Sequence, residues 1–103
     1  MSEPMIMDLK ATRCPEAMLL VRKAIENAVE QEFSGSVCIH TIEQSMSRDL
    51  PFYLNSQTTG VTLVSTGNIP LSATLRVDWL NSAEALEEEL DGIEKIQIFT
   101  LTF

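Results

Sequence analysis

The segment from Pro15 to about Gln31 has the periodicity of an amphipathic α-helix, and it constrains the fold more than any other part of the chain. Apolar residues recur three or four positions apart along it and share one face: Ala17, Leu20, Val21, Ala24, Ile25 and Ala28. Apolar runs at 5–9 and 37–42 flank this segment and are typical of strands. Because a one-sided helix between two strands must cover a sheet, this pattern indicates an α/β fold.

Three further elements are predicted in the middle of the chain. Proline is tolerated in the first turn of a helix but not deep inside one, so Pro51 predicts a short helix over 50–56 with Asp49 as its cap. Strands are expected over 61–65 and 71–79. They would form a hairpin around a turn at 67–70.

The C-terminal part predicts one more helix and one more strand. Asn81 and Glu84 fit a capping box for an acidic helix over 82–91, which Gly92 would end. The alternating segment 93–103 reads as the last strand.

Together these elements predict an α/β two-layer sandwich that forms a single domain over residues 1–103. Its core of about 5–80 has the order β-α-β-α-β-β, with a mixed sheet and the helices on one face. Residues 81–103 would add a helix and a strand as a C-terminal extension. Three placements are open for this extension: over the uncovered sheet face, along the sheet edge, or in a dimer contact.

Charge and hydropathy narrow the classes of function. The net charge of −8 disfavours direct binding to nucleic acid, because an acidic surface repels phosphates. No apolar run approaches the roughly 18 residues of a membrane helix, and the segment 1–10 does not resemble an export signal, so a cytoplasmic protein is expected. Residues 81–103 carry one basic and six acidic side chains, which favours a solvated cover over a docking face.

Two cysteines, Cys14 and Cys38, and one histidine, His40, cannot supply the ligands of a structural zinc site, and we expect no metal and no cofactor. Cys14 is the candidate for chemistry because it directly precedes the predicted helix, whose free N–H groups and dipole stabilise a thiolate. Next to it, Arg13 adds positive potential, Glu16 opposes it, and Pro15 stiffens the loop. From chemistry alone, a reactive thiol and a packed, inert Cys14 have about even odds.

Two separate motifs resemble the TusA family, which includes TusA, SirA and YedF-like proteins. Asp8-Leu9 followed by Arg13-Cys14-Pro15-Glu16 resembles the opening of that family, which runs from a short strand through Leu-Arg-Cys-Pro-x-Pro into a helix. The segment 47–51, Ser-Arg-Asp-Leu-Pro, resembles the family's Thr-Arg-Asp-Ile-Pro. The similarity covers about 5–80. Ala17 replaces the second proline of the motif, and Ala11-Thr12 replaces the usual Gly-Leu.

The resemblance implies a sulfurtransferase of the carrier type. Cys14 would bear a transient persulfide, received from a cysteine desulfurase-like protein and passed to an acceptor protein, while Arg48 and Asp49 would dock or orient a partner. The alternative is a non-catalytic regulatory or interaction module of the same fold, with an inert Cys14. A weaker alternative is a redox switch that uses Cys38 as the second thiol; Cys38 and His40 are otherwise expected to be structural. A homodimer is left open.

Overall fold

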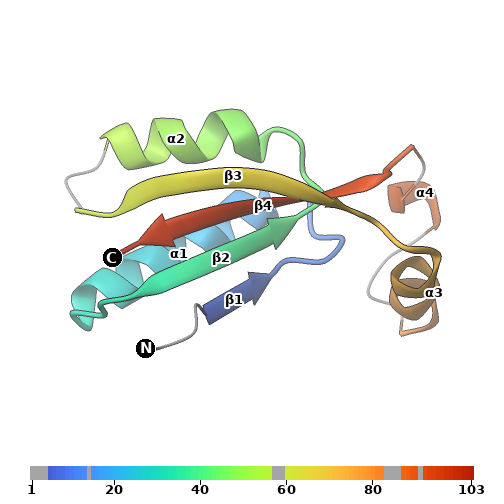
Figure 1. Ribbon diagram of the computed structural model, residues 1–103, viewed down its shortest axis with the longest axis horizontal. Coiled ribbons are helices and arrows are strands. Elements are labelled where there is room, and N and C mark those ends of the chain that lie inside the picture. The colour runs from blue at the N-terminus through green and yellow to red at the C-terminus, as the bar shows by residue number, and fades with distance from the viewer. Residues whose placement is uncertain (1–4, 14, 57–59, 83–86, 91) are drawn as a thin grey trace.

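The computed structural model describes residues 5–13, 15–56, 60–82, 87–90 and 92–103. Its elements follow the order β1 (Met5–Asp8), α1 (Glu16–Glu30), β2 (Ser36–Thr41), α2 (Met46–Ser56), β3 (Thr62–Pro70), α3 (Ala73–Asn81), α4 (Glu87–Leu90) and β4 (Lys95–Thr102). The strands form one sheet in the order β1-β2-β4-β3 (Figure 1).

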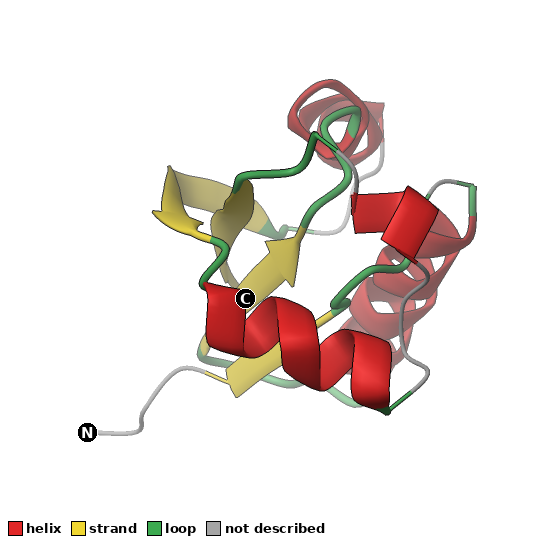
Figure 2. Ribbon diagram, turned by 90° about the vertical axis from the view of Figure 1, so that its right-hand side faces the viewer, coloured by secondary structure: helices red, strands yellow, loops and turns green. Residues whose placement is uncertain are grey.

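The sheet is mixed, and the predicted α/β class is confirmed. β1 pairs parallel to β2, whereas β4 runs antiparallel to both of its neighbours, β2 and β3. The two long helices, α1 and α2, lie on the same side of the sheet, and the other face is open over much of its area (Figures 1 and 2). Since β1 and β2 are parallel, their carboxyl ends lie side by side, and the loops that follow them meet there.

Two apolar clusters hold these layers together. The larger lies between the two long helices and the sheet, and its most buried members are Ala17, Val21, Ile25, Ile39, Met46, Leu50, Phe99 and Leu101. The smaller lies at one end of the molecule, beneath α3 and α4, and includes Ala11, Ile42, Trp79, Leu90 and Ile96. Ile96 lies an odd number of residues from Phe99 and Leu101 along β4, so its side chain is on the opposite face of the sheet. Because Ile96 packs in the smaller cluster, α3 and α4 cover one end of the otherwise open face.

The helix predicted over 15–31 and the strands predicted over 5–9 and 37–42 are confirmed, each to within a residue or two. The buried stripe of α1 is narrower than expected, because Leu20 is 45% exposed. The buried residues Ala17, Val21 and Ile25 lie four apart, so a single row of α1 packs on the sheet.

The strand predicted over 71–79 and its hairpin are wrong. Residues 67–70 continue β3 instead of turning, and α3 follows them. The Ser72 hydroxyl accepts a hydrogen bond from the N–H of Leu75 at 3.1 Å and caps the helix. Trp79, one turn beyond Leu75, is 3% exposed. Capping and burial of this face favour a helix where the apolar alternation alone suggested a strand.

The second helix begins earlier than predicted. It starts at Met46, so Asp49 lies inside α2 rather than at its cap, and Pro51 lies inside the helix. Met46 and Leu50 are both completely buried, and packing of this kind stabilises a helix more than its intrinsic propensity does. The core therefore offsets the backbone hydrogen bond that Pro51 cannot donate.

The C-terminal segment is also arranged differently. Its strand, β4, lies between β2 and β3 in the interior of the sheet, a position that was not among the placements left open, whereas its helix α4 packs at one end of the open face. Asn81 is the last residue of α3 instead of a helix cap. Of the acidic helix expected over 82–91, the described part is α4, and Glu84 lies outside the described residues. None of the described helices has the length and apolar character needed to cross a lipid bilayer.

Candidate functional site at the carboxyl ends of β1 and β2

The loop between β1 and α1 is fixed at several points. Its start is tied to β2 by a hydrogen bond from the N–H of Leu9 to the carbonyl of His40 at 2.9 Å. A tight turn follows, in which the N–H of Thr12 donates to the carbonyl of Leu9 and Lys10 has a positive φ of 50°. Ala11 is 2% exposed and packs in the smaller apolar cluster. The loop thus has a defined path up to Arg13.

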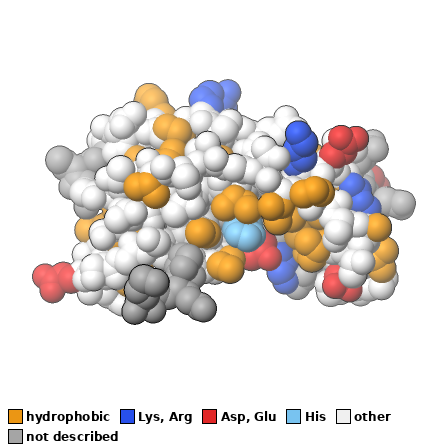
Figure 3. Space-filling model, viewed as in Figure 1, with side chains coloured by type: hydrophobic (Ala, Val, Ile, Leu, Met, Phe, Trp, Pro, Cys, Tyr) orange, Lys and Arg blue, Asp and Glu red, His pale blue; other side chains and the backbone are white. Residues whose placement is uncertain are grey.

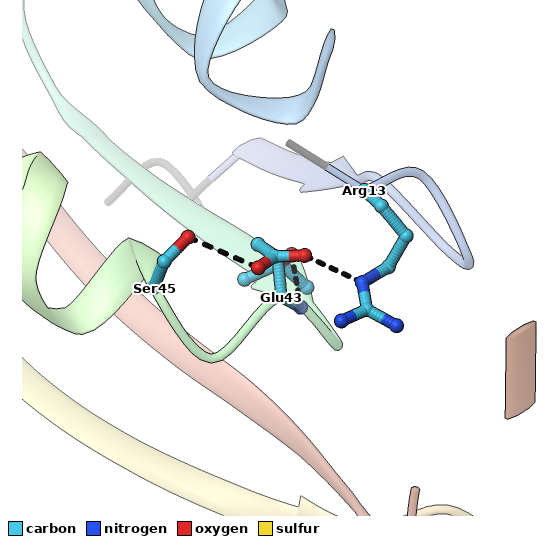
Figure 4. A network of polar contacts seen from close by, with 4 residues as sticks. Arg13, Glu43 and Ser45 are labelled. Atoms are coloured by element: carbon cyan, nitrogen blue, oxygen red, sulfur yellow. Dashed lines mark hydrogen bonds and ion pairs between the residues drawn. The ribbon is translucent and has the colours of Figure 1, made fainter. Parts of the chain in front are cut away.

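Arg13 is held from the next loop by a buried carboxylate (Figure 4). Its Nε donates to Oε2 of Glu43, which lies just beyond the end of β2 and is 9% exposed. The other carboxylate oxygen, Oε1, accepts a hydrogen bond from the Ser45 hydroxyl at 3.0 Å. The N–H of Glu43 donates to Oγ1 of Thr41, which is completely buried. These hydrogen bonds within the loop after β2 hold the Glu43 carboxylate in the position from which it binds Arg13.

This network changes the expected electrostatics around Cys14. Arg13 was predicted to add positive potential, but Glu43 pairs with its guanidinium and compensates much of that charge. The side chain of Arg13 remains 41% exposed, with its terminal nitrogens pointing away from the carboxylate in Figure 4. The charge of Arg13 is thus paired, and the N-terminus of α1 is the other source of positive potential at this end of the helix.

The first turn of α1 begins directly beyond this network. The N–H of Ala17 donates to the carbonyl of Arg13 at 3.0 Å, and Pro15 has helical dihedral angles, with φ −81° and ψ −11°. Ala17 occupies the position of the second proline in the TusA motif, and a proline there could not donate this bond. Ala17 is completely buried, so this replacement joins the turn to the core.

Cys14 itself lies outside the described residues. The structure does describe both residues bonded to it: Arg13, held by Glu43, and Pro15, which is exposed at the start of α1. Glu16 is the exposed first residue of α1. Arg13, Pro15 and Glu16 thus lie at the N-terminal end of α1, and their role beside Cys14 stays a prediction.

Arg48 and Asp49 belong to a neighbouring part of the surface. Nε of Arg48 and Oδ1 of Asp49 form an ion pair at 3.0 Å in the first turn of α2. A groove of about 310 Å³ separates this turn from α1; Asp49 lines it together with Met18, Arg22, Phe52, Tyr53 and Ser56. Asp49 therefore faces α1 one turn after the start of that helix, while the Arg48 side chain is 79% exposed.

Tyr53 of α2 and Arg22 of α1 both line the groove between the two helices and contact each other. The guanidinium carbon of Arg22 lies 5.3 Å from the centre of the Tyr53 ring, at a distance typical of a cation–π contact. Burial raises the pKa of the Tyr53 hydroxyl above its usual value of 10.0. The carboxylate of Glu26 adds to the rise in this pKa, whereas Arg22 opposes it.

Cys38 and His40 lie on the open face of the sheet, where apolar side chains gather (Figure 3). Their cross-strand neighbours on β4 are Thr100 and Ile98, and Sγ of Cys38 is 3.6 Å from Oγ1 of Thr100. This face points away from α1, so the structure does not bring Cys38 or His40 to the groove between the helices. Both are half-buried strand residues.

Sequence reasoning missed Glu43, Ser45 and Thr41. A signal was present, because two strands that each lead into a helix are commonly parallel, and the residues after parallel strands meet at one edge. Arg13 and Glu43 each follow such a strand, and their opposite charges would have made them a candidate pair.

No protein-family model, curated protein or solved structure matches the chain.

Proposed function

We propose that the protein is a sulfur carrier in which Cys14 accepts sulfane sulfur as a persulfide and passes it to an acceptor protein. The observation that supports this most is the fixed loop at the carboxyl ends of β1 and β2. Glu43 holds Arg13, and Pro15 begins the first turn of α1. A thiol bonded into this segment is close to the N-terminus of a 15-residue helix, where a thiolate is favoured.

The chemistry needs only the thiol and a sulfane donor. The Cys14 thiolate attacks the outer sulfur of a donor persulfide, which forms a new S–S bond while the donor's S–S bond breaks. The donor leaves as a thiolate and takes up a proton, so a thiol and a persulfide have exchanged roles with no net oxidation. Attack by an acceptor thiolate on the outer sulfur of the Cys14 persulfide repeats the exchange and regenerates Cys14.

The element order supports the TusA resemblance. Without α3 and α4, the order of the remaining elements is β-α-β-α-β-β, the order that the resemblance implies. The residues between β3 and β4 are then an insertion before the last strand, which lies inside the sheet. This extends the similarity beyond the two sequence motifs to the C-terminal strand.

The surface around the loop supports a protein donor and a protein acceptor. Leu19 and Leu20 on α1 are 48% and 45% exposed, and Phe52 on α2 is 75% exposed. Of these side chains, Phe52 lines the groove between the two helices. Large apolar side chains that remain exposed are typical of a surface that binds another protein. We therefore propose that the donor, a cysteine desulfurase-like protein, docks over the N-terminal half of α1 and the middle of α2.

The test is to incubate the protein with a cysteine desulfurase and cysteine, and to record its intact mass without reductant. Wild type and Cys38→Ser are expected to gain one sulfur that reductant removes, and Cys14→Ser is expected to gain none. Leu20→Glu is expected to slow loading from the enzyme but not from a small-molecule polysulfide. If wild type gains no sulfur from either donor, the carrier function is excluded and a non-catalytic interaction module remains.

A further inference from the structure

The outer strand β3 is an open edge of the sheet. Among the described strands it pairs with β4 alone, and eight of its nine residues are exposed. Half of the backbone N–H and C=O groups of an edge strand point away from the sheet, where they can pair with another chain. Proteins usually block such an edge with charged side chains, prolines or bulges.

In β3 these protections are confined to the ends of the strand. A bulge lies between Leu63 and Ser65, and Pro70 ends the strand. Between them, the segment 65–69 pairs regularly with β4 and carries no charge. No charged residue occurs from Leu50 to Leu75, although 21% of the whole chain is charged. The middle of β3 is therefore regular, exposed and unprotected.

Gly67, at the centre of this segment, is not explained by the monomer. Gly35, Gly60 and Gly92 have φ values of 142°, 77° and 76°, which side chains rarely adopt, but Gly67 is not among the glycines with positive φ. A Cβ at Gly67 would meet no heavy atom within 4 Å. Glycine weakens a strand and often marks a point where another backbone approaches closely. None of the residues that the structure describes makes such an approach to Gly67.

We propose that β3 pairs antiparallel with β3 of a second copy of this chain, with the two-fold axis at Gly67, to form a continuous eight-stranded sheet. In this register Ser65 lies opposite Ile69 of the second copy, and Thr66 lies opposite Asn68. These pairs are uncharged, so two chains of net charge −8 meet at their least repulsive edge. The other edge, β1, has only four residues and ends in Asp8.

The test is the association constant from sedimentation equilibrium. Thr66→Lys/Asn68→Lys places like charges directly opposite each other twice and is expected to weaken the dimer at least about tenfold. Thr66→Glu/Asn68→Lys places opposite charges at the same positions and is expected to restore it. Thr102→Lys is the matched control, because this exposed threonine lies on an interior strand; it is expected to leave the dimer unchanged.

Gly67→Val separates the dimer contact from the stability of the fold. The valine has space and an acceptable φ, so the melting temperature of the monomer is expected to rise while association weakens. A wild-type protein that is monomeric at every concentration would overturn the proposal. Equal association of the two double variants would also overturn it, because the register would then be wrong.

Discussion

A buried carboxylate fixes Arg13, the last described residue of the loop between β1 and α1. Glu43 binds Arg13 through one oxygen and Ser45 through the other, and its own N–H is bonded to Thr41. This arrangement joins the loop after β1 to the loop after β2. The position of Arg13 therefore depends on a residue thirty positions away in the chain, which no local pattern around Cys14 reveals.

Glu43→Gln is expected to lower the free energy of unfolding by about 1–3 kcal/mol, because a charge-assisted hydrogen bond from Arg13 is lost. Urea denaturation measures this change, and Glu30→Gln on the exposed surface of α1 is the matched control. A double-mutant cycle with Arg13→Ala is expected to show coupling of about 0.5–3 kcal/mol. Strictly additive effects would mean that the two side chains do not stabilise each other.

The reactivity of Cys14 is expected to depend more on the helix than on Arg13. Because Glu43 compensates the charge of Arg13, Arg13→Ala should change the alkylation rate of Cys14 at neutral pH by less than about tenfold. The measurement is the rate of iodoacetamide labelling in the Cys38→Ser background, with an unstructured peptide that contains Cys14 as the reference. A rate in the folded protein no faster than in the peptide would contradict thiolate stabilisation.

Among the elements, those with one consistent pattern were predicted and those with two competing patterns were not. α1 combines a helical period with a proline start, and β2 has β-branched residues at alternate positions, so both were identified from local sequence. In the stretch 71–79, which contains most of α3, Leu71, Leu75 and Trp79 recur every four residues, but the same stretch also alternates apolar and polar residues. The cap at Ser72 and the burial of Trp79 decide for the helix.

The cap gives a direct prediction for α3. Ser72→Ala removes the acceptor for the N–H of Leu75 and is expected to destabilise the protein by about 1 kcal/mol. Ser72→Asn retains a cap acceptor and should restore most of this loss. Thermal or urea denaturation compares the three proteins. An unchanged stability in Ser72→Ala would show that α3 is held by packing alone.

The position of β4 could not be predicted from its own sequence. Alternation identified it as a strand, but strand order depends on contacts between distant segments. β4 enters between β2 and β3 because two of its apolar residues, Phe99 and Leu101, complete the core under both long helices. A segment expected to extend the domain is thus central to its sheet.

For the molecule as a whole, the titration of Tyr53, the chain's only tyrosine, makes the free energy of unfolding depend on alkaline pH. Burial raises the pKa of Tyr53 in the folded state above 10.0, so the unfolded state loses this proton first as the pH rises. The contribution of Tyr53 to stability is therefore complete below pH 10 and is lost as the pH rises through the pKa of the folded state. Tyr53→Phe should show a smaller loss of stability between about pH 9 and pH 11.

Absorbance of the phenolate measures this titration directly. The midpoint in the folded protein is expected above that of the urea-unfolded chain. Equal midpoints in the two states would contradict the burial of the hydroxyl between α1 and α2. The same comparison tests the packing of the groove that Tyr53 and Arg22 line.

The most direct test of the sulfur-carrier proposal is to locate the added sulfur within the chain. Wild-type protein loaded by a cysteine desulfurase is alkylated to protect any persulfide, digested, and examined by peptide mass spectrometry. The proposal predicts that the extra sulfur is on the peptide that contains Cys14 and that added acceptor thiol removes it. Extra sulfur confined to Cys38, or absent from both cysteines, would contradict it.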